Sequence, residues 1–321
     1  MEAHAKGSVF HTAAMIRAIR STPGFEALAL AVTDDDDKIL ALLSSFRIQV
    51  LRNSPPALTS RAVQFAEPLC KNTPQGTAAL SELIAHHDKL MNPKSLMCEI
   101  RPISEPTIEK QPLLQHGYER QDYINYVVRL DQGKDTIWSG INKRLRQKLR
   151  SSWRKGVEVI DDTSPDGVQS LYKLLTESYA RARVPLASIE LFENTLKFLP
   201  PEQVRIRTAM YQGERVASVI TLIHGDRMFS WYGGTKRVNS ISGFACIVWG
   251  DIEWGCENGL KYYDFGGAGW PYENYGPRKF KRNFGGDEIR YGRYTKTYSP
   301  IRLRVAEFAY QISRRLGFWS R

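Results

Sequence analysis

Long hydrophobic runs are missing from this 321-residue sequence. The longest nearly uninterrupted ones, residues 28–32 and 39–43, fall well short of the ~20 residues that a membrane-spanning helix requires. Residues 1–10 also lack the apolar core of a signal peptide. We therefore expect a cytoplasmic protein without a spanning helix.

Cysteine and histidine are scarce. The four cysteines lie far apart and form no Cys-x-x-Cys pair, and none has histidines at the spacing of metal ligands. His86 and His87 precede Asp88, but adjacent side chains on a helix diverge and no third ligand is near in sequence. We expect reduced thiols, no metal site and no tightly bound cofactor.

Acidic residues are outnumbered by basic ones, 34 to 45, which gives a formal net charge of +11 and a pI near 9.4. An excess of this size favours a polyanionic partner: nucleic acid, a phosphorylated small molecule or an anionic membrane surface. Charge alone does not choose among these three.

Length and patterning predict a mixed α/β protein of two domains. At ~150 residues per domain the chain holds two cores. The second half predicts helices, a three-stranded meander, a further helix and a further strand, and the first half reads as a degenerate version of the same unit. We place the domains at 1–134 and 135–321, the second including a basic linker helix at 135–155 and a C-terminal helix at 300–316. Other expected elements are helices at 11–20, 76–90, 166–183, 188–198 and 243–258, and strands at 25–32, 39–51, 95–100, 123–130, 157–160, 204–211, 215–224, 228–232, 261–265 and 288–294.

The basic linker helix has two chemically different faces. Ile141, Leu145, Leu149 and Trp153 form an apolar stripe, and basic residues gather opposite it. Seven basic residues and no acid occur between positions 143 and 155, whereas a solvated face usually mixes signs. We interpret Lys143, Arg146 and Arg150 as contacts for a phosphate-bearing ligand, an RNA backbone or anionic lipid; the alternative is an exposed linker.

The most specific segment runs from Tyr262 to Tyr291. It contains Tyr-Tyr-Asp-Phe-Gly-Gly at 262–267 and Lys-Phe-Lys-Arg-Asn-Phe-Gly-Gly at 279–286. Gly266 and Gly267 allow positive φ angles and a close approach of the backbone to a ligand. The lysines that follow can supply positive charge, although Phe280 and Phe284, four residues apart, would also simply pin a short helix.

This segment resembles the FemABX family of peptidoglycan-bridge aminoacyltransferases and their acyltransferase relatives of the GNAT superfamily. Three further blocks fit the resemblance in order: residues 10–12, 155–157 and 231–234, the last including Tyr232. The resemblance implies two tandem GNAT-like domains, the first degenerate. It also implies that Lys281 stabilises the phosphorylated acceptor and the developing oxyanion, with Lys279 in support.

The resemblance further implies an aminoacyl-tRNA donor and, as acceptor, an amine of a phosphorylated or lipid-linked cell-wall sugar precursor. One alternative keeps the fold and uses acyl-CoA to acylate a sugar or surface-polysaccharide precursor. An alternative of another class is a non-catalytic adaptor that binds RNA or a membrane.

The donor site is expected at residues 236–243, before the helix at 243–258. Ser242 and Gly243 would offer free N–H groups at a helix N-terminus, and Lys236 and Arg237 would add charge. The Arg/Gln-x-x-Gly-x-Gly/Ala loop of typical coenzyme A users is absent from this segment. Its absence favours aminoacyl-tRNA as the donor.

Three further charged residues are candidates for the reaction. Asp251 lies on an apolar arc of its predicted helix, where burial would raise the pKa and make it a candidate base. Glu99 and Arg101 share one face of a predicted strand, as an ion pair or as a polar cleft wall. Relatives carry an acidic residue near the first of these positions, which makes Glu99 a second candidate base.

The C-terminal helix has an apolar stripe at residues 301, 305, 308, 312 and 316. Packing on the second domain is the simplest explanation of this stripe. The aromatic and basic end of the sequence also suggests peripheral contact of residues 301–321 with the inner face of the membrane.

Overall fold

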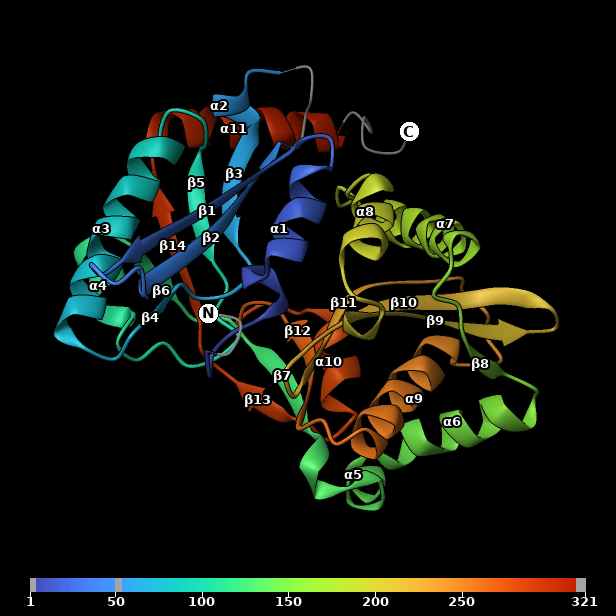
Figure 1. Ribbon diagram of the computed structural model, residues 1–321. Helices are drawn as coiled ribbons and strands as arrows, with labels where there is room; N and C mark the ends of the chain where they lie inside the picture. The colour runs from blue at the N-terminus through green and yellow to red at the C-terminus, as the bar shows by residue number, and fades with distance from the viewer. Residues whose placement is uncertain (1–3, 50–53, 316–321) are drawn as a thin grey trace. The chain divides into compact units, whose positions relative to one another are not determined.

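The computed structural model describes residues 4–49 and 54–315, and it divides into two compact units (Figure 1). Unit 1 joins residues 1–122 to residues 291–321, and unit 2 is the continuous segment 123–290. The sequence pattern placed the boundary at 134/135 and the C-terminal helix in the second domain. The structure instead returns the chain to unit 1 after Arg290, because a late strand completes the sheet of that unit.

Unit 1 is a mixed sheet covered by helices. Its strands run in the order β1-β2-β3-β5-β14-β6, and β4 pairs with β2. β14 is an interior strand, hydrogen-bonded to β5 on one side and β6 on the other. The elements are η1 (Val9–His11), α1 (Ala13–Arg20), β1 (Phe25–Thr33), β2 (Ile39–Gln49), α2 (Pro56–Thr59), β3 (Ser60–Gln64), β4 (Leu69–Cys70), α3 (Pro74–Met91), β5 (Met97–Ile100), α4 (Lys110–Gln115), β6 (Glu119–Gln121), β14 (Arg293–Thr297) and α11 (Pro300–Arg315).

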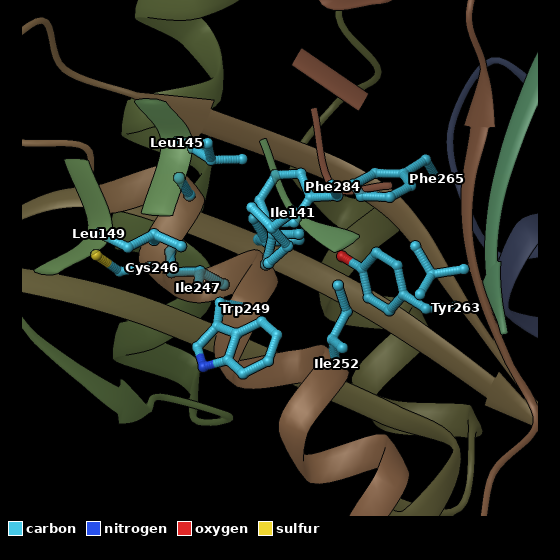
Figure 2. Close-up of a cluster of buried hydrophobic side chains, with 14 of the residues drawn as sticks. Ile141, Leu145, Leu149, Cys246, Ile247, Trp249, Ile252, Tyr263, Phe265 and Phe284 are labelled. Carbon is cyan, nitrogen blue, oxygen red and sulfur yellow. The ribbon is translucent and has the colours of Figure 1, made fainter. Parts of the chain in front are cut away.

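Unit 2 is a second mixed sheet, with the strand order β13-β7-β12-β11-β10-β9-β8. Its core lies between this sheet and helices α5, α6 and α9, and Figure 2 shows the part where Leu145 and Leu149 meet Cys246 and Trp249. The elements are β7 (Asn125–Arg129), η2 (Leu130–Gln132), α5 (Lys134–Gly140), α6 (Lys143–Arg154), β8 (Glu158–Asp161), α7 (Pro165–Ala182), α8 (Glu190–Phe198), η3 (Pro201–Gln203), β9 (Val204–Tyr211), β10 (Glu214–His224), β11 (Arg227–Thr235), α9 (Gly243–Glu257), β12 (Tyr262–Gly267), α10 (Gly276–Arg282) and β13 (Asp287–Ile289).

The two units repeat one arrangement. In unit 1 the antiparallel strands β1, β2 and β3 are followed by α3 and then by β5, which pairs parallel with β3. In unit 2 the antiparallel strands β9, β10 and β11 are followed by α9 and then by β12, which pairs parallel with β11. The predicted mixed α/β class is therefore confirmed, and the architectural repeat is present in the strand pairing.

Two elements that the sequence predicts as continuous are each divided in the structure. The helix expected at 135–155 is two helices, because Ile141 is extended and the Asn142 side chain accepts the Arg144 N–H to begin α6. The strand expected at 288–294 is two strands, β13 and β14, which belong to different sheets. Between them Gly292 has a φ of 80°, a left-handed conformation that breaks the strand.

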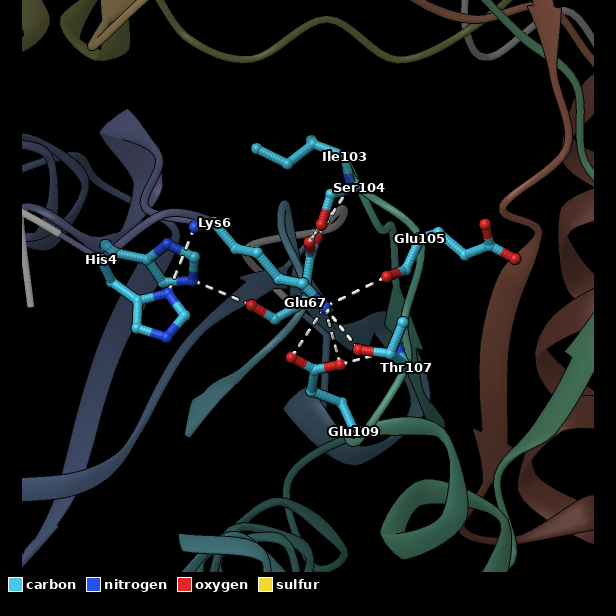
Figure 3. Close-up of polar contacts among 9 residues, drawn as sticks. His4, Lys6, Glu67, Ile103, Ser104, Glu105, Thr107 and Glu109 are labelled. Carbon is cyan, nitrogen blue, oxygen red and sulfur yellow. Dashed lines mark hydrogen bonds and ion pairs between the residues drawn. The ribbon is translucent and has the colours of Figure 1, made fainter. Parts of the chain in front are cut away.

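A partly buried polar cluster ties Lys6 to the loop before α4 (Figure 3). The Lys6 ammonium lies 3.0 Å from a Glu109 carboxylate oxygen and also donates to the Thr107 hydroxyl. The neighbouring Glu67 carboxylate accepts the Ile103 N–H at 2.8 Å, and burial raises the pKa of Glu67. Because these charges are paired or hydrogen-bonded, the cluster fixes the course of the chain here.

None of the helices in the described ranges combines the length and the apolar content that crossing a bilayer demands. The same ranges hold no cluster of three or more histidine, cysteine, aspartate or glutamate side chains arranged to bind a metal ion. The last six residues of the predicted membrane contact, 316–321, and the end of the strand predicted at 39–51 lie outside the described residues.

Candidate active site

The site in unit 2 begins where two central strands separate. β11 and β12 are paired only at Arg227–Phe229 against 262–264, after which β11 continues with β10 and β12 continues with β7. The C-terminal ends of β11 and β12 are therefore not hydrogen-bonded to each other, although both strands lie in the middle of the sheet. Such a switch point is where open α/β sheets bind ligands.

The end of β12 is shaped by Asp264 and the two glycines that follow. The buried Asp264 carboxylate accepts the Gly266 N–H at 2.7 Å and an Arg227 N–H at 3.0 Å. Gly266 has a φ of 65°, and a Cβ on Gly267 would lie 2.6 Å from the Tyr123 ring. Burial raises the pKa of Asp264, and the Arg227 guanidinium opposes that shift. Asp264 therefore organises the glycine turn.

Lys281 reaches this turn from α10. Its ammonium donates to the carbonyl oxygens of Phe265, at 2.6 Å, and Gly267, at 2.7 Å. Burial lowers the pKa of Lys281 to about 8, and the negative charge of Asp264 opposes the shift. The side chain is therefore a desolvated cation held at the end of β12.

A cavity of about 760 Å³ lies beside α10 and between the starts of two helices. One wall comes from α6 and another from the first turn of α9, and Val216, Phe244 and Phe280 supply apolar surface. Among the described residues that line it, none is acidic and five are basic: Lys143, Arg144, Lys148, Lys236 and Lys279. A cavity with this charge suits an anionic ligand, although Lys236 is also paired with Glu214 at 2.6 Å.

The start of α9 offers backbone donors to this cavity. Ser242, Gly243, Phe244 and Ala245 line it, and within the described residues Ser242 makes no side-chain cap. The Ser242 N–H, expected to be free, instead donates to the Ser152 hydroxyl at 2.9 Å, so the donors left for a ligand are those that follow it. A Cβ on Gly243 would lie 3.1 Å from a Val216 methyl group, so glycine lets the helix start pack against β10. Free N–H groups and the positive end of the helix dipole together favour a phosphate or carboxylate.

The helix at the corresponding place in unit 1 is closed to such a ligand. Thr73 caps α3 by accepting the Gly76 N–H, and Pro74 at the first position has no N–H to give. A Cβ on Gly76 would lie 2.2 Å from the Lys71 carbonyl oxygen, because the preceding chain packs directly on the helix start. Of the two equivalent helix starts in the described chain, that of α9 faces the cavity.

The predicted α6 residues divide between two places. Lys143 lines the cavity, whereas Arg150 lines a separate groove of about 500 Å³ with Gln147, Trp153 and Arg154. Trp153 stacks on Trp138 of α5 at a centroid distance of 5.8 Å, and the Arg150 guanidinium lies 5.5 Å from the Trp138 ring. Arg146 lies between these residues on the partly exposed side of α6.

The other predicted residues of unit 2 do not line the cavity. Arg237 is exposed, and Tyr232 packs in an aromatic cluster with Tyr179 and Phe192. Asp251 is fully buried in α9, where it accepts the Thr221 hydroxyl at 2.9 Å and lies 3.8 Å from Arg207. Burial raises the pKa of Asp251 to about 6, in the predicted direction.

Glu99 and Arg101 belong to unit 1 and form an ion pair, one of the two alternatives expected for them. Arg293 of β14 donates to the second Glu99 oxygen at 3.1 Å. Burial alone would raise the pKa of Glu99, but the charges of Arg101, Arg293 and Arg61 outweigh it and hold the pKa at about 2. A carboxylate held so acidic is a poor proton acceptor near neutral pH, so this geometry does not favour Glu99 as a base.

Sequence reasoning missed two asparagines that frame the cavity. Asn142 begins α6, and its backbone N–H donates to the carbonyl of Asn283, just after α10, at 2.8 Å. Both residues line the cavity. Asparagine before a helical run is an N-cap signal that could have located the break before α6.

Comparisons with known proteins bear on the fold of the chain. Residues 141–281 match the family described as an acetyltransferase (GNAT) domain. The chain also resembles the crystal structure of FemX over 95% of its length and 96% of that chain, with a TM-score of 0.70 and 13% identity. The chain therefore contains a segment similar to a GNAT domain and shares the fold of FemX.

Three other known proteins are similar to part or most of the chain. A UDP-N-acetylmuramoylpentapeptide-lysine N(6)-alanyltransferase of Weissella viridescens is 24% identical over 149 residues, which are 46% of this chain and 44% of that protein. The match thus spans less than half of the relative's length. A tandem GNAT protein from the clavulanic acid pathway has a TM-score of 0.56 at 11% identity, covering 89% of this chain and 88% of its own. The L-PGS of Bacillus licheniformis has a TM-score of 0.58 at 12% identity, covering 97% and 98%.

Proposed function

We propose that the chain transfers an aminoacyl group from aminoacyl-tRNA to an amine of a phosphorylated cell-wall sugar precursor. The observation that carries the proposal is the basic cavity at the start of α9, whose wall includes Lys279 of α10. Lys281, two positions further along α10, does not line the cavity and holds the end of β12 instead. The name of the Weissella viridescens relative, an alanyltransferase acting on a UDP-linked muramoyl pentapeptide, supports the same reaction.

The reaction needs a nucleophile, a polarised carbonyl and a leaving group. The acceptor amine attacks the ester carbonyl carbon, a C–N bond forms, the C–O bond to the ribose breaks, and the amine proton ends on the leaving hydroxyl or in solvent. The Lys281 ammonium has three N–H groups, two of which hold the β12 carbonyls. The third would donate to the oxyanion of the tetrahedral intermediate.

The structure of α6 favours an RNA donor over acyl-CoA. Its basic residues line the cavity on one side and the Trp153 groove on the other, so a ligand longer than the cavity can continue along the helix. Trp153, 38% exposed and flanked by Arg150 and Arg154, is suited to stack on a base of a single strand. Acyl-CoA is the alternative donor and an outcome of the test below.

Replacement of Lys281 tests the catalytic proposal. We expect Lys281→Ala to lower kcat by a factor of about 10² to 10³, because one oxyanion donor is lost. Lys279→Ala, which removes a neighbouring cation of the cavity wall, should mainly raise KM. The measurement is transfer of a labelled aminoacyl group to the UDP-linked precursor, with folding checked by circular dichroism. A Lys281→Ala protein that folds and transfers normally would refute the catalytic role and leave the adaptor alternative.

Replacement of Trp153 tests the donor. We expect Trp153→Ala to raise KM for full-length aminoacyl-tRNA about tenfold or more and to leave KM for an aminoacylated adenosine unchanged. Tyr272→Ala is the matched control, because Tyr272 is an exposed aromatic residue of unit 2 outside both the cavity and the groove. Transfer that requires acyl-CoA and survives ribonuclease would overturn the RNA donor.

The acceptor is either a soluble nucleotide-linked sugar or its lipid-linked form. Peripheral contact of residues 301–321 with the inner face of the membrane would bring the lipid-linked form within reach. Transfer to the two acceptors, measured side by side, distinguishes them.

A further inference from the structure

The C-terminal helix α11 carries an uncovered apolar stripe. Ile301, Val305, Phe308 and Ile312 recur at helical spacing along one face and are 77%, 54%, 67% and 41% exposed. They make up four of the nine large hydrophobic side chains that stand exposed in the described residues. Single exposed hydrophobic residues are ordinary, but a continuous stripe marks an interaction surface.

The opposite side of α11 is fixed to unit 1. Arg302 donates to the backbone carbonyl of Asn92 at 2.8 Å, and its own N–H donates to the Ser299 hydroxyl where the helix starts. The helix also packs against α2, as Figure 1 shows. Leu303 and Ala306 are partly buried on this side. The stripe is therefore held facing outward by contacts on the other face.

The charges of α11 identify what would cover the stripe. The helix contains four arginines, at 302, 304, 314 and 315, and a single acid, Glu307. Arg304 is exposed next to the stripe. A second copy of the same helix would bring like charges together, whereas an anionic bilayer surface accepts the apolar side chains and neutralises Arg304 beside them.

We propose that α11 is an interfacial helix that docks the chain on an anionic membrane surface, with Ile301, Val305, Phe308 and Ile312 inserted at the boundary of head groups and acyl chains. The net charge of +11 strengthens the attraction over the whole chain. The proposal concerns membrane binding alone and does not depend on the transfer reaction.

Vesicle flotation of the full chain tests the proposal. We expect binding to vesicles of phosphatidylglycerol with phosphatidylcholine, weakening as salt is added, and much weaker binding to vesicles of phosphatidylcholine alone. The double variant Val305→Ser/Phe308→Ser should bind the anionic vesicles about tenfold less tightly or worse, because two inserted side chains are lost. Arg304→Gln should reduce the salt dependence.

Leu114→Ser is the matched control, since Leu114 is 46% exposed in the same unit but lies on α4. It should bind vesicles as the parent chain does. Equal binding by the parent and the stripe variant would overturn the proposal. The proposal would also be overturned if the parent chain failed to bind vesicles and instead dimerised with rising concentration, as seen by light scattering, and if the stripe variant did not dimerise. Transfer assays on the same proteins report separately on the catalytic proposal.

Discussion

At the scale of single residues, Asp251 and Lys281 show how burial changes the chemistry of a charge. Both lie in unit 2, and burial moves the pKa of each toward the neutral form, to about 6 for Asp251 and about 8 for Lys281. Neither side chain lines the cavity, but Lys281 follows the lining residues Lys279 and Phe280 in α10 and holds the end of β12, whereas Asp251 accepts the Thr221 hydroxyl of β10. Geometry, rather than the shifted pKa, therefore separates the catalytic candidate from the structural one.

Asp251→Asn tests that separation. The pKa of Asp251 is near 3.8 in the unfolded chain and about 6 in the folded one, so the folded state binds more protons between these values. The free energy of unfolding should consequently fall as pH rises from about 4 to about 6. We expect Asp251→Asn to remove this part of the pH dependence, measured by urea unfolding across that range.

The same variant decides whether Asp251 is a base. If Asp251 is structural, the variant should keep its transfer rate within about twofold, because the Thr221 hydroxyl can still donate to the amide oxygen. A loss of kcat with an unchanged fold would instead support Asp251 as the base. Groups whose pKa is lowered, such as Asp88 and Glu99, titrate in both proteins. Comparing parent and variant at each pH therefore removes their contribution to the pH dependence.

At the scale of elements, the end of β12 depends on small residues. The glycines at 266 and 267 were predicted from the sequence as a turn that a ligand could approach. Gly266 does have a positive φ, but Gly267 is needed for another reason, the ring of Tyr123 beside it. The sequence pattern locates the turn. The residue that requires a glycine at position 267 is Tyr123, which lies 144 positions earlier in the chain, so no local rule indicates it.

Gly267→Ala should destabilise unit 2 by about 1 to 3 kcal/mol, because the added Cβ would lie 2.6 Å from Tyr123 Cε1 and the ring must shift. Gly276→Ala at the start of α10 is the control, since a Cβ there meets no described atom within 4 Å. Thermal unfolding of both variants measures the difference. Equal melting temperatures would contradict the tight packing of Tyr123 on this turn.

The break before α6 illustrates a second limit at this scale. The charge and apolar patterns continue through residues 135–155, so periodicity predicts one helix. The structure ends α5 at Gly140 and restarts at Lys143, because Asn142 is anchored to the Asn283 carbonyl and caps the new helix. That anchor places the α6 start at the cavity, and it is a tertiary contact.

At the scale of the whole molecule, the order of the segments predicts which parts fold alone. Unit 2 is continuous, so the fragment 123–290 should unfold cooperatively by itself. The fragment 1–122 lacks β14, the interior strand between β5 and β6 whose Tyr294 is buried. It should therefore lack cooperative unfolding.

Linking residues 291–315 to the fragment 1–122 through a short flexible linker should restore cooperative unfolding, because β14 can then pair with β5 and β6 again. Circular dichroism and urea titration of the three proteins provide the measurement. Cooperative unfolding of 1–122 alone would show that β14 is dispensable to the unit.

The sequence by itself determined the mixed α/β class, most strand and helix positions, the glycine turn after β12 and the basic character of α6, because each depends on local propensity or periodicity. Only the tertiary structure decided which strands became neighbours outside the predicted meander, that β13 and β14 joined different sheets, and that α11 belonged to unit 1. It also decided that the start of α9 faces a cavity while the start of α3 is closed. These features depend on contacts between residues far apart in the chain, which no local pattern encodes.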